Sequence, residues 1–443
     1  MSDSVPPAAT TGIHSSPPDI AELAKVWGRI GILSFGGPAA QIALIHREVV
    51  DRRGWLSEAQ FLNALSFCMF LPGPEAMQLA TYGGWRTHGV AGGLIAGSLF
   101  VLPGAVIVFA LAAFYAWFGD VPLVEAAFIG IKAAVVIIVI EALLRVARRA
   151  LLKPVHWFIA AAAFVALFLF AMPYPLVIVV AGLAGFLLRQ GDGPNDDKAE
   201  PGKRLPISST IRTAVTWLAI WLLPLMVLDL AMPEAVLGEI GRFFSLLATV
   251  TFGGAYAVLA YMAQEAVETY RWLTASEMID ALGLAETTPG PLILVTEFVG
   301  FLAAARADGT ANIGLGTAGT VVTLWATFAP CFLWIFVGAP FIDEIQKMPR
   351  LQGALSGITA AVVGVILNLS VWFGLNAAFG TVERAALGPV QPWVPDLDTL
   401  DWRVPLLAAV AAWLILRRHW EIVPVLAANV ALVLLIYAAG WSG

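Results

Sequence analysis

Two stretches, FLPGPEAMQ at residues 70–78 and ETTPGPLIL at residues 286–294, decide the fold that this sequence predicts. Each places Pro-Gly-Pro within an otherwise apolar segment. Proline has no amide hydrogen to donate and cannot continue the preceding helical turn, but it is favoured where a new helix begins. Each Pro-Gly-Pro therefore predicts a break between two half-helices.

The composition around the breaks is that of an integral membrane protein. The chain has 443 residues, of which 59% are hydrophobic and 13% charged, and its mean hydropathy is +0.83. Apolar runs of about 20 residues, enough to cross a bilayer core about 30 Å thick, lie at 88–119, 154–171, 174–188, 213–230, 314–342, 351–375 and 422–441. Residues 1–21 are rich in proline and serine, which predicts a disordered tail rather than a signal peptide.

Several other classes of protein are disfavoured by the composition. The net charge of −6 provides no basic surface for nucleic acid. The five histidines and two cysteines form no metal-ligand spacing, and no GxxxxGK[ST] motif is present to bind ATP. We therefore expect no metal, no cofactor and no enzyme activity. If the protein transports a solute, it does so as a secondary transporter or a channel.

The two breaks belong to two copies of one unit. A shift of 217 residues aligns 34–74 with 251–291 without a gap, and 14 of the 41 positions are identical. After an insertion of ten residues the shift becomes 227, and GIKAAVV at 130–136 meets GITAAVV at 357–363. The first unit runs from about residue 22 to 146 and its copy from about 239 to 374.

Charged residues in the loops predict how the two units are oriented. Basic residues concentrate at 145–153 and 189–212, which places these segments in the cytoplasm. Acidic residues concentrate at 229–241 and 376–403, which places those outside. Three spans separate the units, so the second copy is expected to be inverted relative to the first.

These observations predict an all-α polytopic membrane protein with two inverted-topology repeats and about 13 transmembrane segments. The N-terminus is expected in the cytoplasm and the C-terminus in the periplasm. The predicted domains are an N-terminal repeat domain at 22–190, a cytoplasmic linker at 191–211 and a C-terminal repeat domain at 212–443.

Local patterns predict a short helix before each break. Ser57 to Gln60 and Thr274 to Glu277 match the [ST]xx[EQ] capping box, which opens a helix. The helices are expected at 57–70 and 274–287, too short to span the membrane, and Glu277 is interpreted as a cap.

The breaks also predict an anion-binding site. A helix break at membrane depth is tolerated only where it is buried in protein or lines a cavity. The N-terminal amides and positive dipole end of the helix after each break attract an anion, and inverted repeats would bring both ends together near the midplane. The alternative is that these glycines and prolines only permit close helix packing. The predicted substrate-binding residues are Gly36, Gly37, Pro72, Gly73, Pro74, Gln78, Lys132, Gly253, Gly254, Thr288, Pro289, Gly290 and Pro291.

Four charged residues in apolar segments are candidates for specific roles. Lys132, replaced by threonine in the second copy, is the predicted counter-charge for the anion, with snorkelling to the interface as the alternative. Glu75, Glu286 and Glu297 are candidates for proton coupling. Glu75 alternatively complements a helix N-terminus.

The segments FGGPAAQIALIHREVVDRRGWLSEAQFLNALSFCMFLPGPEAMQLATYGGW and GGLIAGSLFVLPG closely resemble the N-terminal signature of the chromate ion transporter (CHR) family. TFGGAYAVLAYM, WLTASEMIDALGLAETTPGPLILVTEFVGF and GALSGITAAVVGVILNLSVWF resemble its C-terminal half. The resemblance implies the long, two-domain form, which exports chromate from the bacterial cytoplasm across the inner membrane and confers chromate resistance. It also implies about thirteen spans in halves of opposite orientation.

The expected partners are chromate and the lipid bilayer, without nucleic acid. Sulfate has the same shape and charge as chromate, so proton-coupled uptake of sulfate or another oxyanion is the alternative function. The inverted repeats suggest a complete pathway in each chain, and a homodimer is an alternative.

Overall fold

The computed structural model describes residues 18–119, 121–188, 207–232, 235–252, 254–342 and 348–439. Within this part of the chain, five helices are long and apolar enough to cross a membrane. They are Glu75–Phe118, Pro122–Ala150, Ser208–Ala231, Ile313–Phe341 and Pro349–Ala378. The prediction of a helical, multi-pass membrane protein is confirmed.

The helices form two series in the same order, joined by α8 (Ile207–Ala231). The first series is α1 (Ile20–Leu33), α2 (Gly37–His46), the π-helical turn η1 (Arg47–Asp51), α3 (Glu58–Cys68), α4 (Glu75–Phe118), α5 (Pro122–Ala150), α6 (Pro154–Phe168) and α7 (Tyr174–Leu188). The second is α9 (Val236–Val250), α10 (Ala255–Gln264), the π-helical turn η2 (Glu265–Thr269), α11 (Ala275–Thr287), the 3₁₀ turn η3 (Leu292–Leu294), α12 (Val295–Ala305), α13 (Ile313–Gly338), the 3₁₀ turn η4 (Ala339–Phe341), α15 (Pro349–Ala378), α16 (Arg403–Ala412), the π-helical turn η6 (Trp413–Arg417) and α17 (Ile422–Ala438).

The short helices before the breaks form as predicted. Ser57 caps α3 and Thr274 caps α11, and each makes a complete capping box with Gln60 or Glu277. Glu277 also pairs with Arg306, at 2.6 Å between Oε1 and Nη1. A new helix, α4, begins directly after the first break, and the η3 turn leads into α12 after the second.

Helix α4 is a helical hairpin rather than one long rod. His88 and Gly89 have non-helical backbone angles. A Cβ atom added to Gly84 would lie 2.1 Å from the carbonyl oxygen of Gly92, whereas eight residues of straight helix separate two positions by about 12 Å. The arms before and after His88 are therefore antiparallel. They correspond to α12 and α13 of the second series, which a loop at 306–312 connects.

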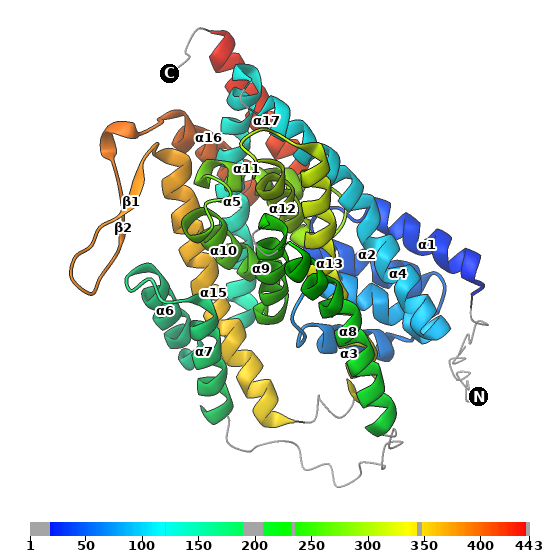
Figure 1. Cartoon of the computed structure of the whole chain (residues 1–443). Helices are drawn as coiled ribbons and strands as arrows, with labels where there is room; N and C mark the ends of the chain where they lie inside the picture. The colour runs from blue at the N-terminus through cyan, green and yellow to red at the C-terminus, as the bar shows by residue number, and fades with distance from the viewer. Residues whose placement is uncertain are drawn as a thin grey trace, which may run out of the picture.

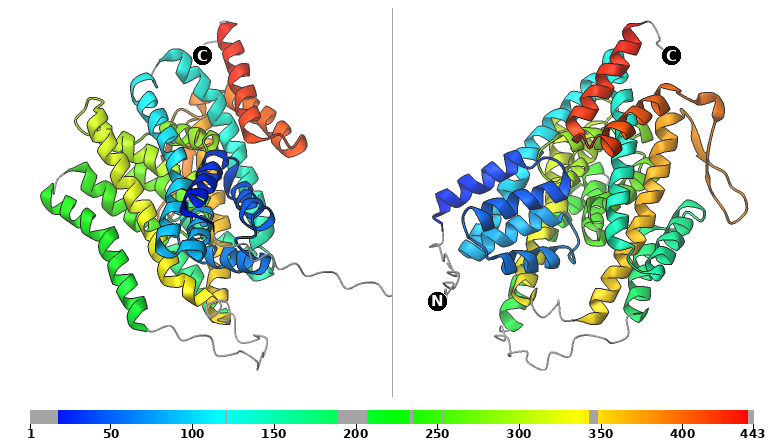
Figure 2. Two further views of the ribbon diagram at one scale, coloured as in Figure 1. Left: turned by 90° about the vertical axis from the view of Figure 1, so that its right-hand side faces the viewer. Right: turned by 180° about the vertical axis from the view of Figure 1, so that it is seen from behind.

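Helix α12 lies near the centre of the molecule, and longer helices surround it (Figures 1 and 2). Every residue of α12 is buried. Helices α5 and α15 pack together, and the two figures show them running in opposite directions. Helices α6 and α7 pack against α15, whereas α16 and α17 pack against α5. Each series therefore ends in a pair of helices that covers the last long helix of the other series.

The prediction of an all-α fold is wrong in one small region. Between α15 and α16, strands β1 (Val382–Arg384) and β2 (Trp393–Pro395) form an antiparallel ribbon, which the 3₁₀ turn η5 (Leu397–Thr399) follows. Arg384 lies over the ring of Trp393, at 4.2 Å from its centroid, and this cross-strand pair stabilises the ribbon.

Candidate functional site

Each Pro-Gly-Pro break is hydrogen-bonded to the opposite half of the chain. The amide of Gly73 donates to the carbonyl oxygen of Thr251 at 3.0 Å, and the amide of Gly290 donates to the carbonyl oxygen of Ser34 at 2.9 Å. Residues 34 and 251, like 73 and 290, are one repeat apart in the sequence. The two breaks therefore make reciprocal contacts, as equivalent residues do across a two-fold axis.

These bonds correct one part of the predicted anion site. The break amides were expected to be free for an anion, but those of Gly73 and Gly290 already have acceptors within the protein. Both residues have positive φ, 111° and 92°, which glycine adopts without strain. The amides that lack helical acceptors are those of the first turn after the break.

The breaks also pack against the second arm of the opposite hairpin. A Cβ atom at Gly104 would lie 2.2 Å from the carbonyl oxygen of Pro289, and one at Gly73 would lie 3.0 Å from Sγ of Cys331. Residues 104 and 331 are again one repeat apart, and each follows a proline inside its helix. Close packing, which the sequence left as the alternative role of these motifs, is thus observed at both breaks.

The side chains around the breaks satisfy backbone acceptors. Gln78 Nε2 donates to the carbonyl oxygen of Pro72 at 2.7 Å, and Thr288 Oγ1 donates to that of Ala285 at 2.9 Å. Gln41, which the sequence analysis did not single out, donates to the carbonyl oxygen of Gly290 at 2.6 Å. These polar groups therefore hold the break geometry in this conformation.

The helices that follow the two FGG motifs begin at one cavity. Gly36 is the N-cap of α2 and Gly254 is the N-cap of α10, while Gly253 lies outside the described residues. The first residues of both helices line a cavity of about 210 Å³, which Glu75, the first residue of α4, also lines. Three helix N-termini therefore contribute to one cavity, and each brings unpaired amides and a positive dipole end.

Helix α5 adds two arginines to this cavity. Arg145 and Arg149, one turn apart, line it together with Tyr256 of α10. Arg145 forms an ion pair with Glu141 on its own helix, and the Tyr256 hydroxyl donates to Oε1 of Glu286 at 2.7 Å. In the sequence, both arginines indicate only the orientation of the loops, because spacing within one helix does not reveal which cavity that helix faces.

The volume and chemistry of the cavity suit a small anion. A site for one water needs only about 10–15 Å³, so 210 Å³ has room for an oxyanion with part of its hydration shell. Arginine binds oxyanions through paired N–H groups, and helix N-termini add backbone donors. As a carboxylate, Glu75 repels an anion in the cavity, and protonation of Glu75 removes this repulsion.

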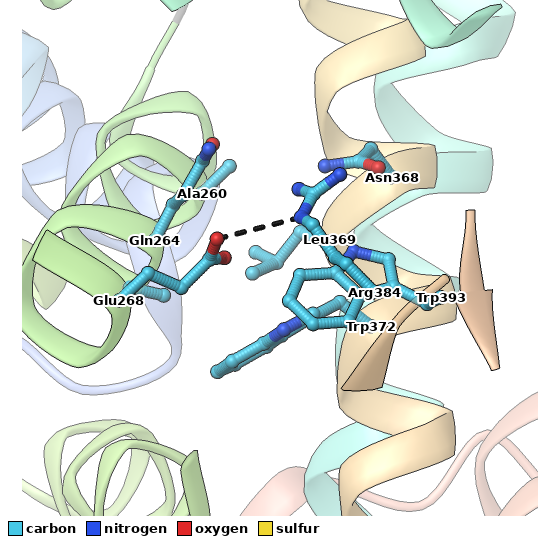
Figure 3. A pocket seen from close by; sticks show the side chains of 9 residues that line it. Ala260, Gln264, Glu268, Asn368, Leu369, Trp372, Arg384 and Trp393 are labelled. Carbon is cyan, nitrogen blue, oxygen red and sulfur yellow. Dashed lines mark ion pairs between the residues drawn. The ribbon is translucent and has the colours of Figure 1, made fainter. Parts of the chain in front are cut away.

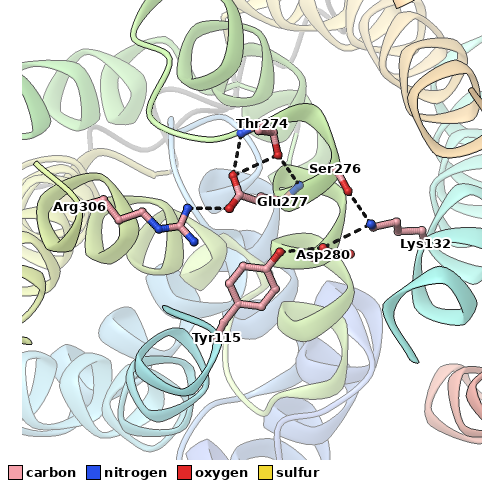
Figure 4. A network of polar contacts seen from close by, with 7 residues as sticks. All are labelled: Tyr115, Lys132, Thr274, Ser276, Glu277, Asp280 and Arg306. Carbon is pink, nitrogen blue, oxygen red and sulfur yellow. Dashed lines mark hydrogen bonds and ion pairs between the residues drawn. The ribbon is translucent and has the colours of Figure 1, made fainter. Parts of the chain in front are cut away.

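Lys132 lies elsewhere, in a network that joins the two halves (Figure 4). Its Nζ atom is 2.5 Å from Ser276 Oγ and 3.6 Å from Asp280 Oδ2, which also accepts a hydrogen bond from Tyr115 at 2.8 Å. The Lys132 side chain is only 14% exposed. In this conformation it is therefore neither a free counter-charge nor a snorkelling residue, because Asp280 neutralises it.

A second, much smaller cavity lies beside the β-ribbon (Figure 3). Glu268 of η2 and Arg384 of β1 form an ion pair across it, at 3.5 Å between Oε2 and Nε, with Gln264 and Trp372 nearby. Its volume of about 10 Å³ holds one water at most. It is therefore a packing contact between η2 and the β-ribbon rather than a second substrate site.

The three predicted proton-coupling carboxyls have different surroundings. Glu75 faces the cavity, whereas Glu286 is buried and accepts a hydrogen bond from Tyr256. Glu297 is fully buried within α12. None of them forms an ion pair within the described part of the chain.

Comparison with known proteins places these features in a family. The profile described as chromate transporter matches residues 21–186 and 238–441, so α8 lies between the two matches. The chromate transport protein of Cupriavidus metallidurans is 28% identical over 83% of this chain and 86% of its own length. The chromate transport protein of Pseudomonas aeruginosa is 29% identical over 92% of this chain and 95% of its own. No solved structure matches the chain.

Proposed function

Because this chain belongs to the chromate transporter family, we propose that it is a secondary transporter that exports chromate from the cytoplasm across the bacterial inner membrane. The observation that carries the proposal is the cavity where α2, α4 and α10 begin and where Arg145 and Arg149 project. Chromate resistance would follow from removal of the ion.

We propose that the cavity binds the tetrahedral dianion. The two arginines would supply paired N–H donors, and the first-turn amides of the three helices would supply further donors at fixed positions. These amides add no side-chain charge that must be buried in the membrane when the substrate has left. Gly36, Gly37 and Gly254 would allow the helix ends to approach the anion closely.

The two series of helices would be inverted repeats that move relative to each other. Two observations support this: the reciprocal hydrogen bonds of Gly73 and Gly290, and the opposite directions of α5 and α15. The first turns of α2 and α10, which follow the two FGG motifs, both line the one cavity, as expected for a site on the axis that relates such repeats. Rocking of one repeat against the other would then expose this site to each side in turn.

The repeat relation supports a role for Lys132 in the opposite state. Thr359, its counterpart in α15, lines the cavity in the present conformation. In the outward-facing state the equivalent surface of α5 would line the site, and Lys132 would leave Asp280 to face the anion. The Lys132–Asp280 pair is then the contact that closes the outer side here.

Charge asymmetry favours the outward direction. Arg145 and Arg149 lie at the end of α5 that is predicted to be cytoplasmic, and their counterparts in α15 are Trp372 and Asn376. Anions would therefore be attracted from the inside and not retained on the outside. The membrane potential acts in the same sense, since moving a dianion through 100 mV is worth about 4.6 kcal/mol, or about three decades of gradient.

Proton coupling would involve Glu75 most directly, because its carboxylate shares the cavity with the anion. Like charges repel, so binding of a dianion and protonation of Glu75 would favour each other. Glu286 would act through Tyr256, because its carboxylate accepts a hydrogen bond from the Tyr256 hydroxyl.

The test is chromate accumulation in inside-out vesicles with an imposed, interior-positive potential, with and without excess sulfate. Wild-type protein should accumulate chromate in proportion to the potential. Arg145→Gln should lower the apparent affinity about 10- to 100-fold, the equivalent of one or two charged hydrogen bonds. Arg148→Gln is the matched control, because Arg148 is exposed on the same helix and does not line the cavity.

Two outcomes would contradict the proposal. Equal transport by Arg145→Gln and Arg148→Gln would remove the cavity as the substrate site. Flux of sulfate alone, and only under a proton gradient, would support the alternative of proton-coupled oxyanion uptake.

A further inference from the structure

One buried carboxyl group has no partner. Glu297, near the start of α12, is 0% exposed, and within the described residues neither of its carboxylate oxygens makes a hydrogen bond. An ionised carboxylate without a partner is strongly disfavoured inside a membrane protein. The group must therefore hold a positive charge of its own, as a bound proton or as a bound cation.

The contacts of α12 with α13 show where this carboxyl lies. A Cβ atom on Gly300 would be 1.9 Å from Oγ1 of Thr323, and one on Gly319 would be 2.5 Å from Cβ of Ala304. The two helices are thus antiparallel, and Gly300 and Ala304 face α13. Glu297 precedes them at helical spacing, three and seven residues earlier, and so lies on the same face.

Three threonines of α13 lie on the opposing face. Thr320, Thr323 and Thr327 are buried, and within the described part of the chain their hydroxyl groups have no hydrogen-bond partner. Glu297 lies about 4.5 Å before Gly300 along its axis, and Thr327 lies about 6 Å beyond Thr323 along the antiparallel axis. Helical geometry therefore places Glu297 between the levels of Thr323 and Thr327 along the two helices.

The hairpin of the first half has no such cluster. Gly84 and Gly92 make the contact there that Gly300 and Gly319 make here. Three residues before Gly84 is Thr81, whose hydroxyl donates to the carbonyl oxygen of Met77 at 3.0 Å. The counterparts of the three threonines are Gly93, Ala96 and Phe100. The hairpin therefore folds without a buried carboxyl, and packing does not explain Glu297.

No described charge from the elements around α12 pairs with Glu297. Helix α13 and the η3 turn contain no charged residue, and Cys331 is the titratable group of α13. The charged residues on α4, α9 and α11 are Glu75, Arg86, His88, Glu239, Arg242, Glu277, Asp280 and Glu286. Of these, Arg242, Glu277, Asp280 and Glu286 have partners of their own in Asp229, Arg306, Lys132 and Tyr256.

We propose that Glu297, Thr323 and Thr327 form a binding site for one monovalent cation, a proton or a sodium ion, separate from the anion cavity. Carboxylate and hydroxyl oxygens suit a hard cation, and the helix break before α12 leaves carbonyl groups that are not all used in a regular helix. The role as a coupling site rests on the proposed function, whereas cation binding itself does not.

The test is thermal unfolding of the purified full-length protein, followed by tryptophan fluorescence. Sodium is titrated against choline at constant ionic strength, and pH is varied without sodium. A ligand that binds only the folded state raises Tm, so wild-type Tm should rise by several degrees with sodium or with falling pH. Glu297→Gln should lose that response.

Two further variants distinguish the ion and control for folding. Thr323→Val with Thr327→Val should abolish a response to sodium but preserve a response to protons. Thr296→Val is the matched control, because this buried hydroxyl already donates to the carbonyl oxygen of Ile293 at 2.7 Å. It should respond as wild type does. If Glu297→Gln does not fold, Glu297→Asp replaces it and should respond with lower apparent affinity.

The proposal is overturned if Glu297→Gln responds to sodium and pH as wild type does, or if wild type responds to neither. Chromate exchange across proteoliposomes without a cation gradient tests the proposed function alone. Absence of that exchange would contradict the proposed function without affecting the proposed cation site. A Tm that does not depend on cations would contradict the cation site without affecting the proposal of chromate transport.

Discussion

The two Pro-Gly-Pro breaks have the same backbone and different chemistry. In both, the glycine has positive φ and donates to the residue before the FGG motif of the other half, Thr251 or Ser34. After the first break Glu75 faces the anion cavity, whereas after the second Leu292 begins an apolar turn and the carboxyl group appears five residues later, at Glu297.

The comparison shows that the two halves share the backbone contacts of the breaks, whereas their charged residues differ. Arg145 corresponds to Trp372, and Lys132 corresponds to Thr359. Under the proposed function, a symmetric scaffold would allow the same motion in either direction, because both states would be built from equivalent contacts. The unequal charges would then determine which side attracts the anion and which half binds the cation.

The largest expected effect comes from breaking the charge pair that only one half has. Lys132→Ala leaves Asp280 buried without a positive partner, and this should lower the free energy of unfolding by about 3–5 kcal/mol. Thr359→Ala, at the equivalent position, removes only a hydroxyl that donates within its own helix. Thermal unfolding of both variants measures the difference.

A double variant sharpens this result. Lys132→Ala with Asp280→Asn removes both charges and should recover most of the lost stability. If Lys132→Ala is as stable as Thr359→Ala, the ion pair does not hold the two halves together.

The next effect concerns the contact that both halves share. Gly104→Ala would place Cβ 2.2 Å from a backbone oxygen of Pro289, which cannot move as a side chain can. We expect a loss of about 1–3 kcal/mol through overpacking. Cys331→Ala, its counterpart, removes an atom beside Gly73 instead and should cost less. Equal shifts in Tm for the two variants would contradict the reciprocal packing.

A smaller effect is expected where the second half reaches the anion cavity. Tyr256→Phe removes the hydroxyl that donates to Glu286 but keeps the ring. Loss of one hydrogen bond, about 1 kcal/mol, should change apparent chromate affinity about fivefold. Tyr261→Phe is the control, because Tyr261 lies on the same helix and does not line the cavity, and it is expected to leave the affinity unchanged. Chromate uptake into vesicles at several concentrations distinguishes the two.

The smallest effect concerns pH and the β-ribbon, which among the described residues belongs to the second half alone. Burial raises the pKa of Glu268, and the Arg384 guanidinium opposes the shift without cancelling it. The folded state therefore takes up a proton more readily than the unfolded state. The resulting stability is complete below the ordinary glutamate pKa of about 4.3 and is lost as pH rises through the raised value.

Glu268→Gln should remove this contribution, so the variant's Tm should fall less than that of wild type as pH rises. Parallel curves for the two proteins between about pH 4 and 8, on either side of the ordinary glutamate pKa, would show that Glu268 ionises as freely in the folded state as in the unfolded state.

Local features of the fold could be predicted from the sequence, and long-range contacts could not. The capping boxes at Ser57 and Thr274 and the breaks depend on neighbouring residues, so their patterns were sufficient. The reversal at His88–Gly89 was not predicted as a hairpin, because it is defined by the contact between Gly84 and Gly92, which no local pattern specifies.

The site residues were harder to predict for the same reason. Lys132 was recognised as unusual, but its partner Asp280 is 148 residues away, a separation that no local pattern spans. Arg145 and Arg149 were recognised only as loop charges, because their role depends on the cavity that α5 shares with α10. Hydrophobic periodicity shows which face of a helix is buried and not which helix covers it.

The reciprocal bonds of Gly73 and Gly290 have a consequence for biosynthesis. When the ribosome has completed the first half, the acceptor of Gly73 at Thr251 has not yet been made, so the first break waits in the membrane with an unpaired donor. The break can form its final contact only after α9 is inserted, and Ser34 receives its donor later still. Maturation of the first half is therefore tied to insertion of the second, and a chain that stops before residue 251 is expected to be a substrate for membrane quality control rather than a stable half.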